Sequence, residues 1–407
     1  MARAGLILWV LPAVCLAAGQ RDAGLKSLFE NRQWFELRDA VEGADAPAFY
    51  RVAVSCAFGN VRRAESFFQD VVRSDARSAE SFEAHGLLAS AHMRVGHYRQ
   101  ALSHLRAMQA IRPDYSGLSG AVALFQALNR WPQPSIAKRR SSEVRLSDDM
   151  FIPVSVNGKP ANYGFDSGAD FSLMSEAEAR RLGLIIHDAA GSEFQDGASG
   201  NKAGIRFAIA NRFVVGGFEL RNVTFVVFPN DAVPFSELPA EKQGIIGFPV
   251  LLAFRTMRWD GEGRLQIGFR AGSTIRKPNF CVPERSMPVV EGLFGSNRIN
   301  VVLDTGSGRT FLTPRFAKDF LSVVEQAGKK ESTRLRGLGG STVVEAITLP
   351  EFHFQAGGFD LVLRPAQVLP QDSRVDRNSY HVWLGMDLLG QARRVTLDFE
   401  SMRFVLE

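Results

Sequence analysis

The 407-residue chain has only three cysteines and no C-x-x-C pair. Three cysteines are too few for a disulfide framework, and the lack of a pair argues against a zinc site of that kind. None of the seven histidines shows the H-E-x-x-H spacing of a metalloprotease. The formal charge of +5 is too small and too dispersed for a nucleic-acid-binding surface. We therefore expect no metal, no other cofactor and no nucleic-acid partner.

The only long apolar run lies at the start of the chain and is too short to cross a membrane. It covers residues 4–18, directly after Arg3, and small residues stand at 17–19. This order is typical of a cleaved secretion signal, whereas a spanning helix needs ~20 apolar residues. We predict a signal peptide at residues 1–19, export to a bacterial periplasm or the medium, and no stable membrane insertion after cleavage. The alternatives are a membrane anchor, or a lipoprotein with Cys15 at its new N-terminus.

Residues 20–130 show the apolar spacing of helices and few internal glycines or prolines, which predicts a helical domain. Two stretches in it resemble each other, and their glycines, Gly59 and Gly96, are 37 residues apart. A period in this range indicates stacked helix pairs, and the second stretch resembles a tetratricopeptide repeat. Such repeats offer a surface to a protein partner. The alternative is that this domain is only a scaffold for the rest of the chain.

Five histidine and cysteine side chains could in principle bind a metal, but their spacing does not indicate a metal site. His85, His92 and His104 fall in the helical domain, where we interpret them as ordinary helical side chains rather than metal ligands. Cys56 and Cys281 fall in different parts of the chain, and we expect two buried free thiols rather than a disulfide. Neither group is expected to carry the chemistry of the protein.

The composition changes after the helical domain. Residues 131–143 contain two prolines, three consecutive basic residues and two adjacent serines, which indicates an exposed linker. Beyond residue 144, short segments rich in Val, Ile and Phe are separated by Gly, Asn and Asp, the pattern of β-strands. Asn157 and Gly158 among them predict the two-residue turn of a hairpin. We therefore predict a multidomain α and β protein, with helices followed by strands.

The β-rich part contains one pattern twice. Asp-Ser-Gly at residues 166–168 recurs as Asp-Thr-Gly at 304–306, which is 138 residues later. Two landmarks downstream, an apolar-apolar-Gly segment and an apolar-Asp pair, recur with the same offset. Three landmarks with one offset divide this part into two β-rich lobes, at residues 144–272 and 273–407.

These motifs resemble the aspartic proteases. That family has Asp-Ser/Thr-Gly after an apolar strand, then a glycine-rich flap and an apolar-apolar-Gly segment. The sequence at residues 166–170, Asp-Ser-Gly-Ala-Asp, is similar to the retroviral type, and residues 384–389 resemble the closing motif of bacterial retropepsin-like families. The resemblance implies two acid-protease lobes that form a pseudo-dimer within one monomeric chain, as in pepsin. Each lobe would supply one catalytic aspartate, Asp166 and Asp304.

The resemblance also implies the chemistry and the roles of neighbouring residues. Two close carboxylates cannot both ionise comfortably, so they share one proton, and the charged one activates the water that hydrolyses a peptide bond. The residues implied to support the two active-site loops are Ser167, Gly168, Ala169, Thr305, Gly306 and Ser307. Those implied to contact the substrate, mainly as flaps, are Asp170, Gly197, Gly200, Gly337, Gly339 and Gly340.

The two copies differ beside the aspartates, because Ser307 occupies the position of Ala169. A hydroxyl at 307 would hydrogen-bond Asp304 and favour its charged form. We therefore expect Asp166 to be protonated more readily, with activity extending above strongly acidic pH. The main hypothesis is an exported endopeptidase that acts on peptides or proteins. The alternative is a non-catalytic peptide-binding or scaffold protein of the cell envelope on the same fold.

Overall fold

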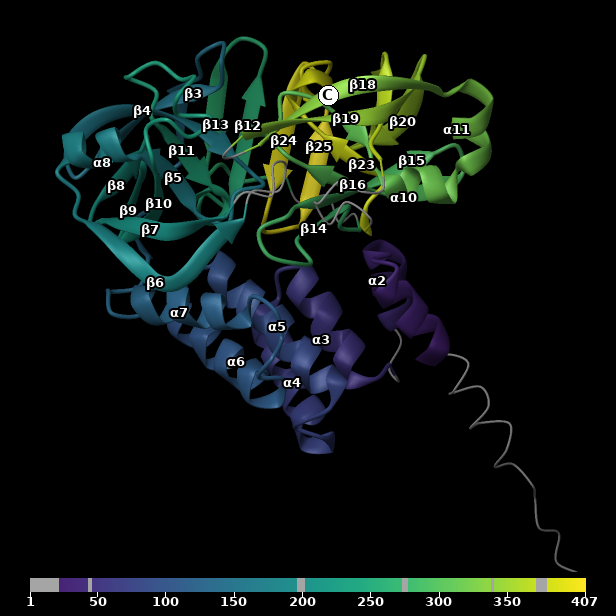
Figure 1. Cartoon of the computed structure of the whole chain (residues 1–407), viewed down its shortest axis with the longest axis horizontal. Coiled ribbons are helices and arrows are strands. Elements are labelled where there is room, and N and C mark those ends of the chain that lie inside the picture. Colours follow the sequence, from purple (N-terminus) through teal and green to yellow (C-terminus); the bar gives the residue numbers. More distant parts are fainter. Residues whose placement is uncertain (1–21, 43–45, 196–201, 273–276, 338–339, 371–378) are drawn as a thin grey trace, which may run out of the picture.

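Helices come first along the chain and strands follow, as the sequence predicts, in this computed structural model (Figure 1). The structure describes residues 22–42, 46–195, 202–272, 277–337, 340–370 and 379–407. The N-terminal helices are α2 (Trp34–Val41), α3 (Ala48–Ala57), α4 (Val61–Ser74), α5 (Ala79–Arg94), α6 (Tyr98–Ile111) and α7 (Leu118–Leu128). Across the described residues, none of the helices has the length and apolar character needed to cross a membrane. The predicted signal peptide and its cleavage site lie outside the described residues.

Helices α3 and α4 form one pair and α5 and α6 another. The turn inside the first pair contains Gly59, with φ +78°, and that inside the second contains Gly96, with φ +75°. Both angles lie in the left-handed region, which glycine adopts at little steric cost. The two glycines that the sequence aligns therefore occupy the same kind of turn. Asn60 caps the second helix of the first pair by accepting a hydrogen bond from the Arg63 N–H.

Three sheets make up the rest of the molecule. The first-lobe sheet contains β1 (Ser135–Lys138), β3 (Phe151–Val156), β4 (Lys159–Asp166), β5 (Ser172–Ser175), β6 (Ile186–Gln195), β7 (Lys202–Ala210), β8 (Phe213–Val215), β9 (Phe218–Arg221), β10 (Val223–Phe228) and β11 (Gly244–Gly247). The second-lobe sheet contains β14 (Phe280–Cys281), β15 (Val289–Phe294), β16 (Asn297–Leu303), β17 (Phe311–Leu312), β18 (Lys329–Gly337), β19 (Gly340–Leu349), β20 (Phe352–Ala356), β21 (Phe359–Leu363), β22 (Ala366–Val368) and β23 (Val382–Leu384). The central sheet contains β2 (Ser142–Arg145), β12 (Thr256–Asp260), β13 (Arg264–Ile267), β24 (Arg394–Asp398) and β25 (Arg403–Leu406). Short helices join them: α8 (Glu176–Leu182), α9 (Phe248–Ala253), α10 (Pro314–Asp319), α11 (Leu321–Ala327) and α12 (Met386–Leu389).

The two lobe sheets share one strand order. In the first lobe the order runs β3-β4-β11-β5-β10-β7-β6, and in the second it runs β15-β16-β23-β17-β22-β19-β18. Each strand of the first series corresponds in chain position to one of the second. The structure thus contains two β-rich lobes, and the aspartate motifs stand at the ends of equivalent strands, β4 and β16.

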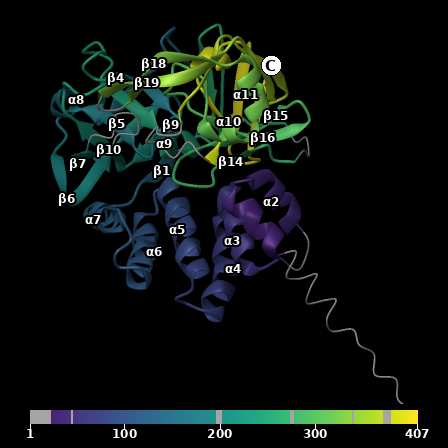
Figure 2. The same cartoon turned by 45° about the vertical axis from the view of Figure 1, so that its right-hand side comes forward.

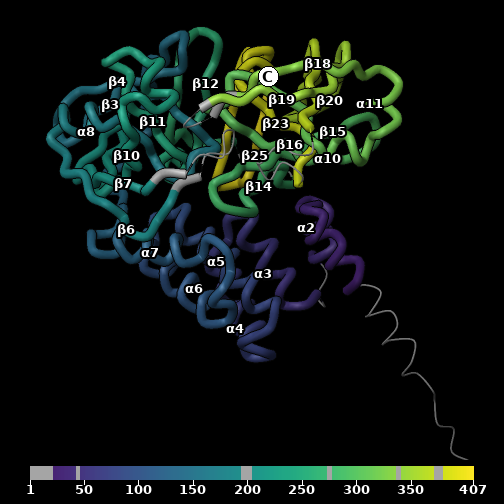
Figure 3. Tube along the Cα trace, viewed as in Figure 1, coloured from purple at the N-terminus to yellow at the C-terminus, as the bar shows by residue number. Residues whose placement is uncertain are grey.

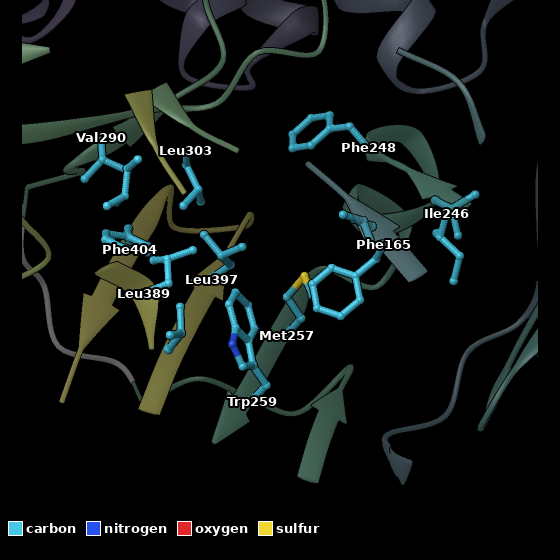
Figure 4. Close-up of a cluster of buried hydrophobic side chains, with 14 of the residues drawn as sticks. Phe165, Ile246, Phe248, Met257, Trp259, Val290, Leu303, Leu389, Leu397 and Phe404 are labelled. Atoms are coloured by element: carbon cyan, nitrogen blue, oxygen red, sulfur yellow. The ribbon is translucent and has the colours of Figure 1, made fainter. Parts of the chain in front are cut away.

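The central sheet joins the lobes because strand β12 of the first pairs antiparallel with β24 of the second. Arg258 lies opposite Thr396, and its Nε donates a hydrogen bond to the Thr396 hydroxyl (3.0 Å). These residues are 138 apart, so equivalent positions of the two copies face each other. Behind the sheet, one hydrophobic core spans both lobes, with Trp259 beside Leu397 (Figure 4). The lobes therefore fold around a shared interior.

Local signals explain several element boundaries. Asn157 (φ +50°) and Gly158 (φ +87°) connect β3 to β4, which confirms the predicted two-residue hairpin turn. Ser175 caps α8 by accepting a hydrogen bond from the Glu178 N–H (3.1 Å). Thr313 precedes α10 without capping it through its side chain, because its hydroxyl donates to the Tyr380 carbonyl.

The predicted linker at residues 131–143 contains strand structure. Strand β1 pairs with β9 at the edge of the first-lobe sheet, and β2 begins at Ser142 in the central sheet. Ser142 also accepts a hydrogen bond from the Gly217 N–H (2.8 Å). This segment therefore adds strands to two sheets on its way from the helices to the first lobe.

The helical domain lies along one side of both lobes (Figures 1, 2 and 3). The Asn300 amide of the second lobe donates to the Arg32 carbonyl (2.6 Å), and the Ser192 hydroxyl of the first donates to the Gly120 carbonyl (2.7 Å). Between these contacts, the Val282 N–H donates to the Ala57 carbonyl (2.7 Å). The helices thus contact both lobes and residues 278–288, which we call the interlobe segment.

Arg94, at the end of α5, is a buried charged residue where the helical domain meets the lobes. Its guanidinium donates to the carbonyls of Arg285 and Cys56, each at 2.9 Å, and only 4% of the residue is exposed. Burial lowers the pKa of Arg94 to about 10. Cys56 and Cys281 are nearby, and both are buried free thiols, as predicted. A buried guanidinium therefore joins the helical domain to the interlobe segment.

The histidines of the helical domain form a cluster that the sequence analysis did not predict. The Nδ1 atoms of His85 and His104 are 2.8 Å apart, and His92 stacks on His104 at 5.6 Å between ring centroids. Burial lowers the pKa values of His85 and His92. The pKa of His104 is lowered to about 3, mainly by burial and to a lesser extent by the charges of His85 and His92. Among the described residues, no group of three or more ligand-type side chains is arranged to hold a metal ion.

We expect this cluster to make the helical domain sensitive to acid. Each folded-state pKa lies below the ordinary histidine value of 6.5, so the unfolded chain binds more protons and stability falls as the pH drops below about 6.5. The loss should reach roughly 1 kcal/mol per pH unit for a histidine that stays neutral when folded. Amide hydrogen exchange of residues 79–111 at pH 7.5 and pH 5 would measure it.

The variant His104→Phe tests whether the histidine cluster causes the acid sensitivity. It should reduce the difference in hydrogen exchange of residues 79–111 between pH 7.5 and pH 5. His353→Gln changes an exposed histidine of the second lobe and is the matched control. Equal pH dependence in the wild type and His104→Phe would contradict the prediction.

Candidate active site

Asp166 and Asp304 come together between the lobes. Asp166 is the last residue of β4, and it pairs in register with Gly247 of the parallel strand β11. Asp304 directly follows β16, and its N–H donates to the Leu384 carbonyl of the parallel strand β23 (3.0 Å). The two carboxyl groups lie beside each other, since a Cβ on Gly168 would be 3.2 Å from Oδ1 of Asp304 and 3.3 Å from Oδ1 of Asp166. Two residues 138 positions apart in the sequence thus form one site.

The hydroxyls beside the aspartates cross from one lobe to the other. The Ser167 N–H donates to the Thr305 hydroxyl (2.9 Å), and the Thr305 N–H donates to the Ser167 hydroxyl (3.0 Å). Each hydroxyl then donates onward to a carbonyl of the opposite lobe, that of Leu303 for Ser167 and that of Phe165 for Thr305. Because these bonds are reciprocal and buried, they fix the distance between the two loops.

The glycines of the two motifs stand where a larger side chain would press on the aspartate of the opposite lobe. A Cβ on Gly306 would lie 2.5 Å from Cγ of Asp166, and one on Gly168 would lie 3.2 Å from Oδ1 of Asp304. Neither glycine has a positive φ, so a tight turn is not the reason for them. Each instead donates its N–H to Oδ1 of the aspartate two residues earlier, at 2.7 Å for Gly168 and 2.9 Å for Gly306.

The environment of the pair favours one proton shared between two carboxyls. Burial raises the pKa of Asp166 well above its ordinary value, and the Asp304 charge raises it further. Hydrogen bonds from the N–H groups of Gly168 and Ala169 oppose the shift without cancelling it. A group that stays protonated beside a carboxylate can act as a general acid, while its partner acts as a general base.

The predicted hydrogen bond from Ser307 to Asp304 is wrong. The Ser307 hydroxyl donates to the Arg309 carbonyl (2.8 Å), because the loop turns it away from the carboxyl group. The donor on Asp304 is instead Trp383, whose indole Nε1 lies 2.7 Å from Oδ2. Trp383 is the first residue of the second apolar-apolar-Gly segment, but the sequence pattern alone does not show where its indole points.

Asp170, predicted to contact the substrate, has partners within the chain. Its carboxylate accepts hydrogen bonds from Nε of Arg285 (2.8 Å) and from the Ser286 N–H (2.9 Å). Both donors come from the interlobe segment, so Asp170 ties the first active-site loop to the start of the second lobe. Sequence reasoning missed Arg285, because no motif surrounds it.

The apolar-apolar-Gly segments lie directly behind the two loops. A Cβ on Gly247 would come within 2.2 Å of the Phe171 carbonyl oxygen, and one on Gly385 within 2.6 Å of that of Arg309. The Gly247 N–H donates to the Ser172 hydroxyl (3.1 Å), and the Gly385 N–H donates to the hydroxyl of Thr310 (2.9 Å). The two lobes therefore support their aspartate loops by the same contacts.

The predicted flaps are β-hairpins whose tips are only partly described. Strands β6 and β7 form the first, and Gly197 and Gly200 lie outside the described residues between them. Strands β18 and β19 form the second, with Gly337 paired to Gly340 and with Gly339 outside the described residues. The contact of these glycines with a substrate stays a prediction.

Comparison with known proteins agrees with part of this site. Residues 152–250 match the family model described as aspartyl protease. Among solved structures, the chain is similar to a retropepsin-like aspartic protease from Rickettsia conorii, at 16% identity over 33% of this chain and 91% of that chain, with a TM-score of 0.22. No curated protein matches. The sequence similarity to aspartyl proteases therefore covers the segment of the first lobe that carries Asp166.

Proposed function

We propose that the protein is an aspartic endopeptidase whose catalytic pair is Asp166 and Asp304. The observation that carries this proposal is the partly buried carboxyl pair, on two loops that reciprocal hydrogen bonds of Ser167 and Thr305 join across the lobes. The match of residues 152–250 to the aspartyl protease model supports it. Two equivalent lobes in one chain support a monomer with an internal pseudo-twofold axis.

The chemistry follows from the protonation of the pair. Asp304, as the carboxylate, takes a proton from a water molecule between the two groups, and this water attacks the carbonyl carbon of a peptide bond. Asp166, as the acid, donates to the carbonyl oxygen as charge develops on it. As the C–N bond of the tetrahedral intermediate breaks, Asp304 passes its proton to the leaving nitrogen and Asp166 takes a proton back from a hydroxyl of the intermediate, so the pair returns to its starting state. The mechanism uses only the two carboxyls and water.

The remaining roles belong to the same proposal. The hairpins β6–β7 and β18–β19 would close over an extended peptide, and the helical domain would support both lobes while leaving a surface for a protein partner. The apolar start of the chain supports export, to a bacterial periplasm or to the medium.

The decisive experiment is a search for cleavage products. The exported protein is incubated with a denatured protein mixture at pH values from 3 to 8, and new termini are identified by mass spectrometry. We expect cuts that disappear when a statine-type peptide, a transition-state analogue, is added, because such analogues bind far more tightly than substrates. Folded protein that makes no cuts at any pH would refute the enzyme and favour a peptide-binding function.

A further inference from the structure

We propose that Trp383 is a positioning residue that keeps Asp304 in its charged, proton-accepting form. The inference rests on the proposed function and names the residue that distinguishes the two carboxyls. Its starting point is the hydrogen bond from the indole Nε1 to Oδ2 of Asp304, at 2.7 Å. This length is typical of hydrogen bonds to a charged acceptor.

The direction of the bond determines its effect. An indole has one donor and no acceptor, so its bond to Asp304 is strongest when that oxygen carries the charge. The other oxygen, Oδ1, accepts from the Gly306 N–H, so both oxygens of Asp304 receive a donor. From outside the pair, Asp166 receives only the backbone N–H groups of Gly168 and Ala169, and no side chain of another described residue donates to it. The proton of the pair is therefore placed on Asp166.

The difference between the two aspartates arises at one position of the apolar-apolar-Gly segments, which otherwise match in the two lobes. Trp383 lies on β23, and the residue 138 positions earlier, on β11, is Ile245. The isoleucine side chain is a hydrocarbon, so it cannot donate a hydrogen bond. It packs instead beside Leu173 and Phe228 of the first lobe. The equivalent strands thus present a donor to Asp304 and none to Asp166.

The indole is held from two sides. Its ring stacks on Phe311, with centroids 5.8 Å apart and planes at 10°. It also packs against a hydrophobic cluster that the helical domain shares with the second lobe, including Val289 and Val302. A ring confined in this way keeps its N–H directed at the carboxylate. The helical domain therefore contributes to the geometry of the pair as well as to the stability of the lobes.

The test removes the indole N–H and keeps an aromatic ring. In Trp383→Phe, we expect the acidic limb of the pH dependence of kcat/KM to move up by about one pH unit, which lowers the rate below that limb about tenfold. KM should change little, because the indole acts on the reacting pair. Trp131→Phe makes the same chemical change at a partly exposed residue and should leave the profile unchanged.

A second measurement does not depend on activity. In protein labelled with ¹⁵N, the Trp383 indole resonance is identified by its absence from Trp383→Phe, and it should move with pH and in Asp304→Asn. An indole resonance that responds to neither would overturn the inference, as would equal pH profiles for Trp383→Phe and Trp131→Phe. If the wild type cleaves nothing, the proposed function fails, and the indole resonance alone decides whether Trp383 stabilises the charged Asp304.

Discussion

Replacing Asp166 by asparagine is expected to abolish peptide hydrolysis and, at the same time, to stabilise the protein. An amide cannot deliver the proton that the scissile carbonyl needs, so the rate should fall at least about 10³-fold. The measurement is kcat/KM on a peptide that contains an identified cleavage site. Asp70→Asn, on the exposed surface of α4, is the matched control and should retain wild-type activity.

The gain in stability follows from the sign of the pKa shift. The folded-state pKa of Asp166 is raised, so the folded protein binds a proton that the unfolded chain releases above its ordinary pKa, and stability falls as the pH rises. Asparagine removes this pH-dependent loss, so the variant should unfold at a higher temperature than the wild type at pH 7. A variant that is inactive and less stable would point to misfolding and contradict the prediction.

Arg94→Met is expected to lower the free energy of unfolding by about 3 kcal/mol. Methionine fills much of the same volume, but the carbonyls of Cys56 and Arg285 lose a charged donor in a buried place. A hydrogen bond to a charged group contributes ~1.5–3 kcal/mol, and leaving its buried partner unsatisfied adds a penalty. Urea unfolding gives the free energy, and hydrogen exchange of residues 278–288 shows whether the interlobe segment is released.

The control for this change is Arg77→Met, on an exposed turn before α5. It should alter stability by less than ~0.5 kcal/mol, as is usual for surface substitutions. An equally small effect of Arg94→Met would mean that the guanidinium does not hold the helical domain to the lobes. If exchange increases at residues 278–288, activity should fall too, because Arg285 in this segment holds Asp170 of the first active-site loop.

Much of the fold follows from periodic signals in the sequence. The constant offset of 138 residues identified two lobes, and the structure gives both the same strand order. The turn at Asn157 and Gly158 was predictable because only a few residue types adopt positive φ readily. The pair Asp166 and Asp304 could be chosen because two copies of one motif imply equivalent positions. These predictions depend on local patterns or on repetition.

The failures concern side-chain direction and contacts between distant segments. Ser307 has the right chemistry for a donor to Asp304, but the loop points its hydroxyl at Arg309. Asp170 meets Arg285, 115 residues later, in a segment with no recognisable motif. The neighbouring histidine rings come from α5 and α6, so their proximity depends on how those helices pack. Spacing along one chain does not contain this information.

The single-chain arrangement has an evolutionary consequence. In an enzyme built from two identical subunits, every mutation appears in both halves, so a change that benefits one carboxyl is imposed on the other. Here residues 245 and 383 are encoded separately, and they are isoleucine and tryptophan. Likewise Pro249 stands where the second copy has Asp387. Because β12 and β24 pair in one sheet, the halves stay joined while the residues around the two aspartates differ between them.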